Sequence, residues 1–152
     1  MDSEPDFLAL WKRAQREFKL KGSLHGPDHW RRVEANGVLL AEQTGADLIV
    51  VRLFALFHDC KRQNDDDDPE HGRRAANFLS EQRPNLLSIS DNQFALLREA
   101  TAYHADGTTH HNPTIGTCWD SDRLDLTRCG LTPAPQFFST MAGRAEARKR
   151  KA

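Results

Sequence analysis

The chain has 152 residues, of which 38% are hydrophobic and 28% charged, and its formal net charge is -1. This length and composition fit one globular domain with a substantial core and exclude a disordered chain. The small net charge gives no overall field that would draw the protein to nucleic acid or to an anionic membrane. The three cysteines are an odd number without C-x-x-C spacing, which argues against a disulfide framework and against a zinc site made of cysteines.

The first half of the chain predicts three helices. Apolar residues recur at three- and four-residue spacing from Asp6 to Leu20, and Gly22 follows as a stop signal. A second helix is expected to start near Pro27 or Asp28 and to end at Gly45. Asp47 can cap a third helix, whose apolar run leads into His58.

The second half predicts three more helices separated by polar loops. In chain order these are a loop over residues 61–67, a helix that Asp68 caps and that runs to Leu79 or Ser80, a helix from the capping box of Ser90 and Gln93 to about His104, a loop over residues 105–113, and a helix from about Ile115 to Leu126. Residues 142–152 are rich in Ala, Arg and Lys and predict a short helix or a frayed tail. No strand pattern and no internal repeat interrupts this order.

The adjacent pair His58 and Asp59 is the strongest functional signal. It ends a buried apolar helix, where an imidazole and a carboxylate each need a partner once they are removed from water. A divalent metal satisfies both, because imidazole nitrogen and carboxylate oxygen are good ligands of first-row metals. His29 begins the preceding helix, and the short connection between the two helices makes them antiparallel neighbours. The start of one helix and the end of the next should therefore meet, and Asp122 can face the same core from the last helix.

This order of His, then His-Asp, then Asp on different helices resembles the HD-domain superfamily of metal-dependent phosphohydrolases over about residues 25–126. The resemblance implies an all-α fold, a single HD-type helical bundle of about six helices. One domain would span residues 1–152, with a core over residues 25–126 and a C-terminal tail over about 131–152. It also implies that a metal is bound by His29, His58, Asp59 and Asp122. Asp120 and Asp125 are rivals of Asp122, which is preferred because the family's last aspartate precedes a basic-apolar pair, as Arg123-Leu124 does here.

Further ligands and the metal follow from the same resemblance. His71 and His104 stand at helix ends, where some members of the superfamily hold a second metal and others contact phosphate; a structural role at the helix ends is the third option. The nitrogen and oxygen donors suit Mn, Fe, Co, Ni or Zn better than Mg, with one ion or two. Arg32 matches the family's H-x-x-R-V pattern and either orients a ligand carboxylate or touches substrate.

The activity implied by the resemblance is hydrolysis of a small phosphorylated metabolite or a nucleotide. The metal would lower the pKa of a bound water from about 16 towards 7, so that hydroxide is available as the nucleophile. Lys61, Arg62 and Arg123 are the candidate catalytic groups that would neutralise charge on the transferred phosphoryl group. The acid that some members carry shortly after the His-Asp pair is missing from residues 60–63.

Two other functions stay open. One is an HD-type di-iron oxygenase, in which the extra histidines bind a second iron, and the other is a metal-stabilised binding or regulatory module without catalysis. We expect a cytoplasmic protein, because residues 1–6 are acidic and lack the layout of a signal peptide and the longest apolar run is too short to span a bilayer. We expect a small phosphorylated substrate, no membrane partner and no specific nucleic-acid partner, and we leave a homodimer open.

Overall fold

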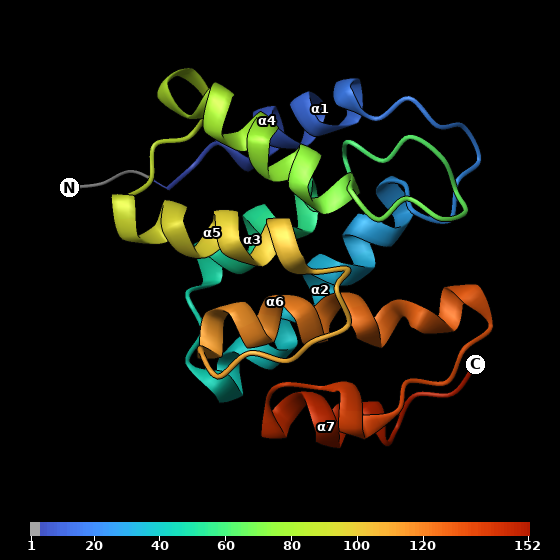
Figure 1. Ribbon diagram of the computed structural model, residues 1–152. Coiled ribbons are helices and arrows are strands. Elements are labelled where there is room, and N and C mark those ends of the chain that lie inside the picture. The colour runs from blue at the N-terminus through green and yellow to red at the C-terminus, as the bar shows by residue number, and fades with distance from the viewer. Residues whose placement is uncertain (1–3) are drawn as a thin grey trace.

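Residues 4–152 are described by a computed structural model, and they form helices and loops without a strand (Figure 1). The α-helices are α1 (Phe7–Glu17), α2 (Pro27–Thr44), α3 (Leu48–Phe57), α4 (His71–Leu86), α5 (Asp91–Tyr103), α6 (Pro113–Arg123) and α7 (Met141–Ala147), and the short 3-10 helices are η1 (Leu124–Cys129) and η2 (Pro135–Phe137). The predicted all-α fold is confirmed.

Helix α3 forms the centre of the bundle. Seven of its ten residues are buried, and it packs against α1, α2, α5 and α6. A helix that is apolar on all sides is stable only when other elements surround it, which explains why this one lies in the middle. Because α3 is central, the residues that follow its end, His58 and Asp59, lie inside the protein and are almost completely buried.

The helix caps predicted at Asp47, at Ser90 with Gln93 and at Gly45 are present. The side chain of Asp47 accepts a hydrogen bond from the backbone N–H of Val50, and Ser90 with Gln93 forms a complete capping box at the start of α5. Helix α2 ends at Gly45, whose φ of 74° is left-handed and therefore suits glycine. These caps fix where α3 and α5 begin and so set the registers that carry His58 and His104.

Two helix boundaries differ from the prediction. Helix α1 ends at Glu17 rather than Leu20, because Phe18 turns away from the helix axis and packs edge-on against Trp30, with ring centres 5.4 Å apart. Helix α6 ends at Arg123, and the chain continues as the tighter helix η1 instead of reaching Leu126 as an α-helix.

The predicted start and end of the fourth helix are wrong. Asp68 does not cap it; its carboxylate accepts hydrogen bonds from the backbone N–H of Gln63 at 2.8 Å and from Arg74 at 2.6 Å, and so closes the preceding loop. Helix α4 begins at His71 instead, and it continues past Ser80 to Leu86 with Pro84 inside its last turn. Hydrogen bonds within residues 63–74 therefore decided a boundary that the capping pattern had placed two residues earlier.

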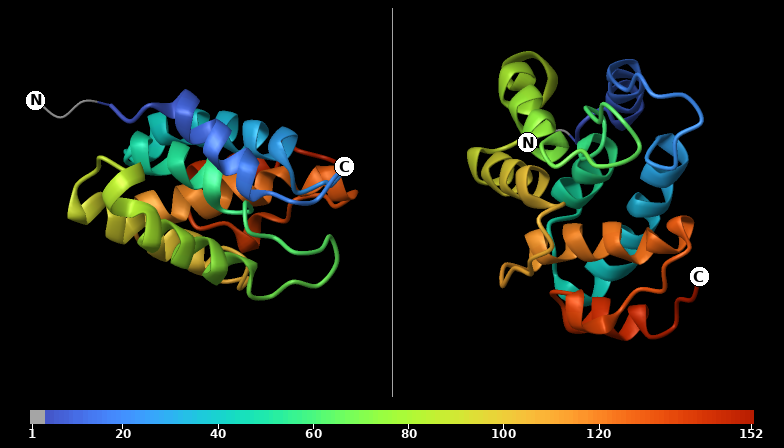
Figure 2. Two further views of the ribbon diagram at one scale, coloured as in Figure 1. Left: turned by 90° about the horizontal axis from the view of Figure 1, so that it is seen from above. Right: turned by 45° about the vertical axis from the view of Figure 1, so that its right-hand side comes forward.

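The C-terminal segment is ordered around a second, small apolar cluster of Leu40, Leu124, Phe138 and Ala147. Through it α7 packs against α2, α6 and η1, while α4 and α5 lie side by side elsewhere on the bundle (Figure 2). A short helix is thus present in the predicted tail. The domain boundaries themselves remain a prediction. The first three residues of the predicted domain lie outside the described residues. Across residues 4–152, no helix has the length and apolar character needed to cross a bilayer.

Candidate metal centre

Four side chains from three helices meet at one end of α3. His29 comes from the first turn of α2, His58 and Asp59 follow α3, and Asp122 comes from the last turn of α6. The Nε2 atoms of His29 and His58 are 3.1 Å apart. The Oδ1 atom of Asp122 lies 3.1 Å from the first and 3.3 Å from the second of these nitrogens, and Asp59 Oδ2 lies 3.3 and 3.4 Å from them. The structure brings together all four residues of the predicted ligand set.

A second group of donors shares Asp59 with the first. The Oδ1 atom of Asp59 lies 3.1 Å from His71 Nε2 and 3.3 Å from His104 Nε2. These two histidines, from the start of α4 and the end of α5, have their Nε2 atoms 2.9 Å apart. The two oxygens of one buried carboxylate therefore face two separate pairs of histidines.

The outward-facing nitrogens of all four histidines are occupied. Nδ1 of His29 donates to Asp125 at 2.7 Å, and Nδ1 of His58 donates to backbone carbonyls of α3 at 3.1 Å. Nδ1 of His71 donates to the carbonyl of Asp68 at 2.5 Å, and that of His104 to the carbonyl of Thr101 at 2.8 Å. A carbonyl can only accept, so in each neutral ring Nε2 carries the free lone pair and points it into the centre.

The rivals of Asp122 have other positions. Asp125 lies behind His29, where it accepts from His29 Nδ1 and from Arg32 Nε at 2.8 Å. Arg32 therefore orients a carboxylate, as one of its two predicted roles required, but this carboxylate supports the histidine His29 and is not itself in the predicted ligand set. Asp120 faces away from the centre and accepts hydrogen bonds from the backbone N–H groups of Ser139 and Thr140 at 2.7 and 2.9 Å.

The charges of the cluster balance within it. Although burial lowers the pKa of His29, hydrogen bonds to Asp122, Asp125 and Asp59 raise it to about 9. Burial also opposes the charged form of His58, but the charges of Asp59 and Asp122 raise its pKa to about 10. The same contacts hold the pKa values of Asp59 and Asp122 well below their usual range against the effect of burial. Without a cation, protons on the histidines must offset the two carboxylates.

These donors fit a divalent transition metal. His29, His58 and Asp59 offer one ligand atom each within 4.8 Å of one another, and so do Asp59, His71 and His104. Facing Nε2 lone pairs at 3.1 and 2.9 Å repel unless a proton or a cation lies between them. A cation bound in each group would satisfy the nitrogens and the buried carboxylates together. The buried His/Asp cluster can thus hold metal.

The three candidate catalytic cations lie in different places. Lys61 pairs with Glu17 at 2.9 Å. Arg123 donates to the carbonyl of Phe137 at 2.7 Å, so the structure brings neither it nor Lys61 to the centre. Arg62 lies beside the second group of donors, with Nη1 3.1 Å from the outward-facing Nδ1 of His71.

Other reactive groups near the pair do not reach the donors. Asp65, Asp66 and Asp67 are exposed in their loop, where Asp65 accepts a hydrogen bond from Ser23. Cys60 is buried, and burial raises the pKa of its thiol, which therefore stays protonated and is a poor nucleophile.

The role of one residue was missed in the sequence analysis. Asp125 had been weighed as a metal ligand, whereas it supports one from behind; the three-residue step from Asp122 on a continuing helix would have placed both on one face. The loop residue His25 contacts the start of α2 through its backbone, because Trp30 Nε1 donates to the His25 carbonyl at 2.8 Å.

Comparisons with known proteins give one informative likeness. No protein-family model and no curated protein matches the chain. A solved structure described as a predicted HD superfamily hydrolase, from an uncultured Thermotogales bacterium, is 24% identical and superposes with a TM-score of 0.77. The match covers 96% of this chain and 85% of the other. With the predicted histidines and aspartates gathered at the end of α3, the chain has the HD-domain fold that its sequence pattern predicted.

Proposed function

We propose that this protein is a metal-dependent phosphohydrolase that acts on a small phosphorylated metabolite or nucleotide at a two-ion centre. The observation that carries the proposal is the convergence of four histidine Nε2 atoms on the two oxygens of Asp59, with Asp122 completing the first group. A ligand set of this kind holds divalent transition metals, and such ions supply an activated water and polarise a phosphoryl oxygen. Mn, Fe, Co, Ni and Zn remain the candidate metals.

The chain's own contribution to the reaction begins with ligand orientation. Asp125 fixes the tautomer of His29, and Arg32 in turn fixes Asp125 by donating to both of its oxygens at 2.8 and 3.1 Å. Backbone carbonyls do the same for the other three histidines. Rings held from behind in this way cannot rotate out of the centre, so the donor geometry is set before any ion binds.

Arg62 favours a phosphorylated substrate. Its Nε atom is buried and has no hydrogen-bond partner among residues 4–152. Its Nη1 atom faces His71 Nδ1, which already donates to Asp68, so this contact joins two donors and satisfies neither. Only Nη2 has an acceptor, the carbonyl of Asp66 at 3.1 Å. A guanidinium with unmet donors beside the centre is suited to pair with phosphoryl oxygens.

A di-iron oxygenase is the second candidate. The pair of His71 and His104 favours it, because the two groups of donors would give each iron histidine ligands and share the carboxylate of Asp59. The hydrolase is preferred because Arg62 offers the unmet donors that a phosphoryl group needs. A hydrolase is also the description given to the solved structure that shares the fold.

The test combines metal analysis with a substrate screen. The purified protein is loaded in turn with Mn, Fe, Co, Ni, Zn or Mg and assayed for phosphate release from a panel of phosphate monoesters and nucleotides. Arg62→Lys should raise KM for the active substrate by about tenfold or more, because one ammonium cannot replace the paired donors. Arg98→Lys, on the exposed face of α5, is the matched control and should leave KM unchanged. Oxygen uptake by the iron-loaded protein without phosphate release would favour the oxygenase instead.

A further inference from the structure

Helices α4 and α5 are in close backbone contact at the ends that carry His71 and His104. Gly72 lies in the first turn of α4, next to His71. A Cβ atom at this position would lie 2.7 Å from the carbonyl oxygen of Thr101 and 2.9 Å from that of Ala102. It would also lie 3.2 Å from Nδ1 of His104. Two of these three obstacles are backbone atoms of α5, which cannot rotate aside as a side chain can.

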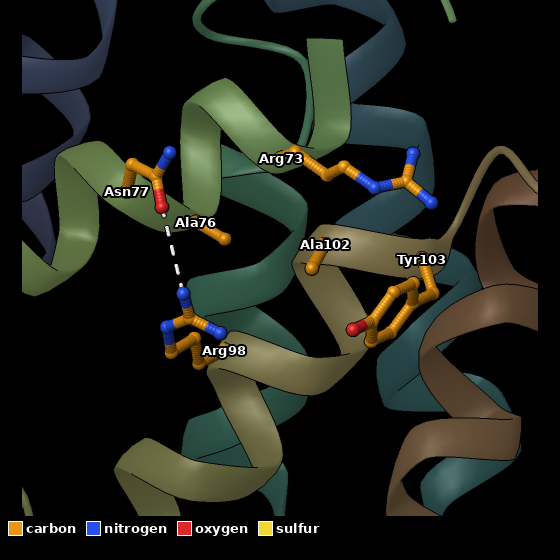
Figure 3. Close-up of a pocket in the computed structure, with 6 residues that line it drawn as sticks. All are labelled: Arg73, Ala76, Asn77, Arg98, Ala102 and Tyr103. Carbon is orange, nitrogen blue, oxygen red and sulfur yellow. Dashed lines mark hydrogen bonds between the residues drawn. The ribbon is translucent and has the colours of Figure 1, made fainter. Parts of the chain in front are cut away.

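Small residues also lie between α4 and α5 one turn further along. Ala76 and Ala102 lie between α4 and α5 and form the small-residue floor of a surface groove, which Arg73, Asn77, Arg98 and Tyr103 line (Figure 3). Both alanines are almost fully buried. The groove lies outside the metal centre, since Arg73 pairs with Asp106 and Arg98 contacts Ser80 and Asn77. Small residues on both helices therefore permit the approach, and Gly72 is the one at the histidine end.

Helix formation alone does not explain a glycine here. A glycine is less favourable than alanine within a helix, and Gly72 is not at a position that needs a left-handed backbone. The glycine permits a short distance between the two helices. With α4 packed against the carbonyls of α5, His71 Nε2 lies 2.9 Å from His104 Nε2. Both nitrogens then lie within 3.3 Å of Asp59 Oδ1.

We propose that Gly72 is a positioning residue for the second metal ion, because the missing side chain lets α4 approach α5 closely enough for His71 and His104 to bind one ion with Asp59. A carbon atom needs about 3.3 Å from a carbonyl oxygen, so an added Cβ must move the helices apart by about 0.6 Å. Metal-ligand distances tolerate only about 0.2 Å. The inference rests on the two-ion centre of the proposed function.

The experiment counts metal in the full-length protein without any substrate. Wild type and Gly72→Ala are saturated with Mn²⁺, passed through a desalting column, and analysed for bound manganese and for the spin-coupled signal of an ion pair. Wild type should retain two ions with coupling. Gly72→Ala should retain one uncoupled ion and bind the second about 10- to 100-fold more weakly, the usual effect of disturbing the support of a metal ligand.

Gly116→Ala is the matched control. It adds the same methyl group at another tight helical position, 3.0 Å from Ser139 Cβ and 3.2 Å from the carbonyl of His110, away from the second group of donors. It should lose comparable thermal stability and keep both ions. If Gly72→Ala does not fold, Ala76→Val carries the test, since it separates the same two helices one turn further along and should weaken the second ion less strongly.

The outcomes separate the inference from the proposed function. Two coupled ions of unchanged affinity in Gly72→Ala, or in Ala76→Val if that variant carries the test, would overturn the positioning role. A wild type with a single ion would also overturn it, while leaving a one-metal hydrolase intact. Two ions in wild type, one in Gly72→Ala and no phosphate release from any ester would uphold the positioning role and remove the hydrolase.

Discussion

Binding of the first metal ion should release between one and two protons at pH 7.5. His29 and His58 have pKa values raised to about 9 and about 10 in the protein without metal, so each carries nearly one proton at this pH. A metal ion binds through the Nε2 lone pairs of both rings, so it must displace the protons bound there. The lower bound is one, because Nε2 atoms 3.1 Å apart can share a single proton.

Unperturbed histidines would give a very different result. With a pKa of about 6.5, each ring would be only about one-tenth protonated at pH 7.5, and the pair would release about 0.2 protons. The sign of the pH effect follows directly: raising the pH removes the competing protons, so the apparent affinity for the first ion should rise by up to about 100-fold from pH 7 to pH 8. With unperturbed histidines the affinity would be nearly flat over that range.

Titration calorimetry in two buffers of different ionisation enthalpy measures the number of protons released. Asp125→Asn should release fewer protons than wild type, because the lost carboxylate is one of the groups that raise the pKa of His29. Asp28→Asn is the matched control: this carboxylate is next to His29 in the chain but exposed, and its removal should change nothing. A wild-type value below about 0.5 protons would refute the argument that the carboxylates of the centre hold its histidines protonated.

Three further predictions follow from the contacts. Asp59→Ala should lose both ions while His104→Ala loses only the second, because Asp59 directs one oxygen to each pair of histidines; mass spectrometry of the folded protein measures the metal count, and equal losses would contradict a shared carboxylate. Asp120→Ala should lower the free energy of unfolding, measured by urea titration, by about 2–3 kcal/mol, because the Asp120 carboxylate accepts hydrogen bonds from residues 139 and 140. The metal count should not change, and loss of an ion would show that Asp120 is a metal ligand. The metal-free protein should lose thermal stability as the pH rises from 6.5 to 10. The pKa values of His29 and His58 are higher in the folded than in the unfolded protein, so their protonation stabilises the fold fully only below the unfolded pKa. A melting temperature that rises over this range would contradict this prediction.

The sequence determined the helices and the ligands that local patterns encode. Caps and glycines mark the starts and ends of α2, α3 and α5 because these signals act within a few residues. The short connection between α2 and α3 was enough to place His29 beside the His58-Asp59 pair, since antiparallel neighbours bring the start of one helix to the end of the next.

Only the tertiary structure decided the contacts that join distant segments. Asp68 is a more local case: it does not cap α4, because the backbone N–H of Gln63 and the side chain of Arg74 donate to its carboxylate instead. Asp122 and Asp125 look alike in sequence, but the turn from α6 into η1 directs one into the centre and the other behind His29. The second pair of histidines depends on how closely two helices approach, and that distance is set by the missing side chain of Gly72, which no local pattern reveals.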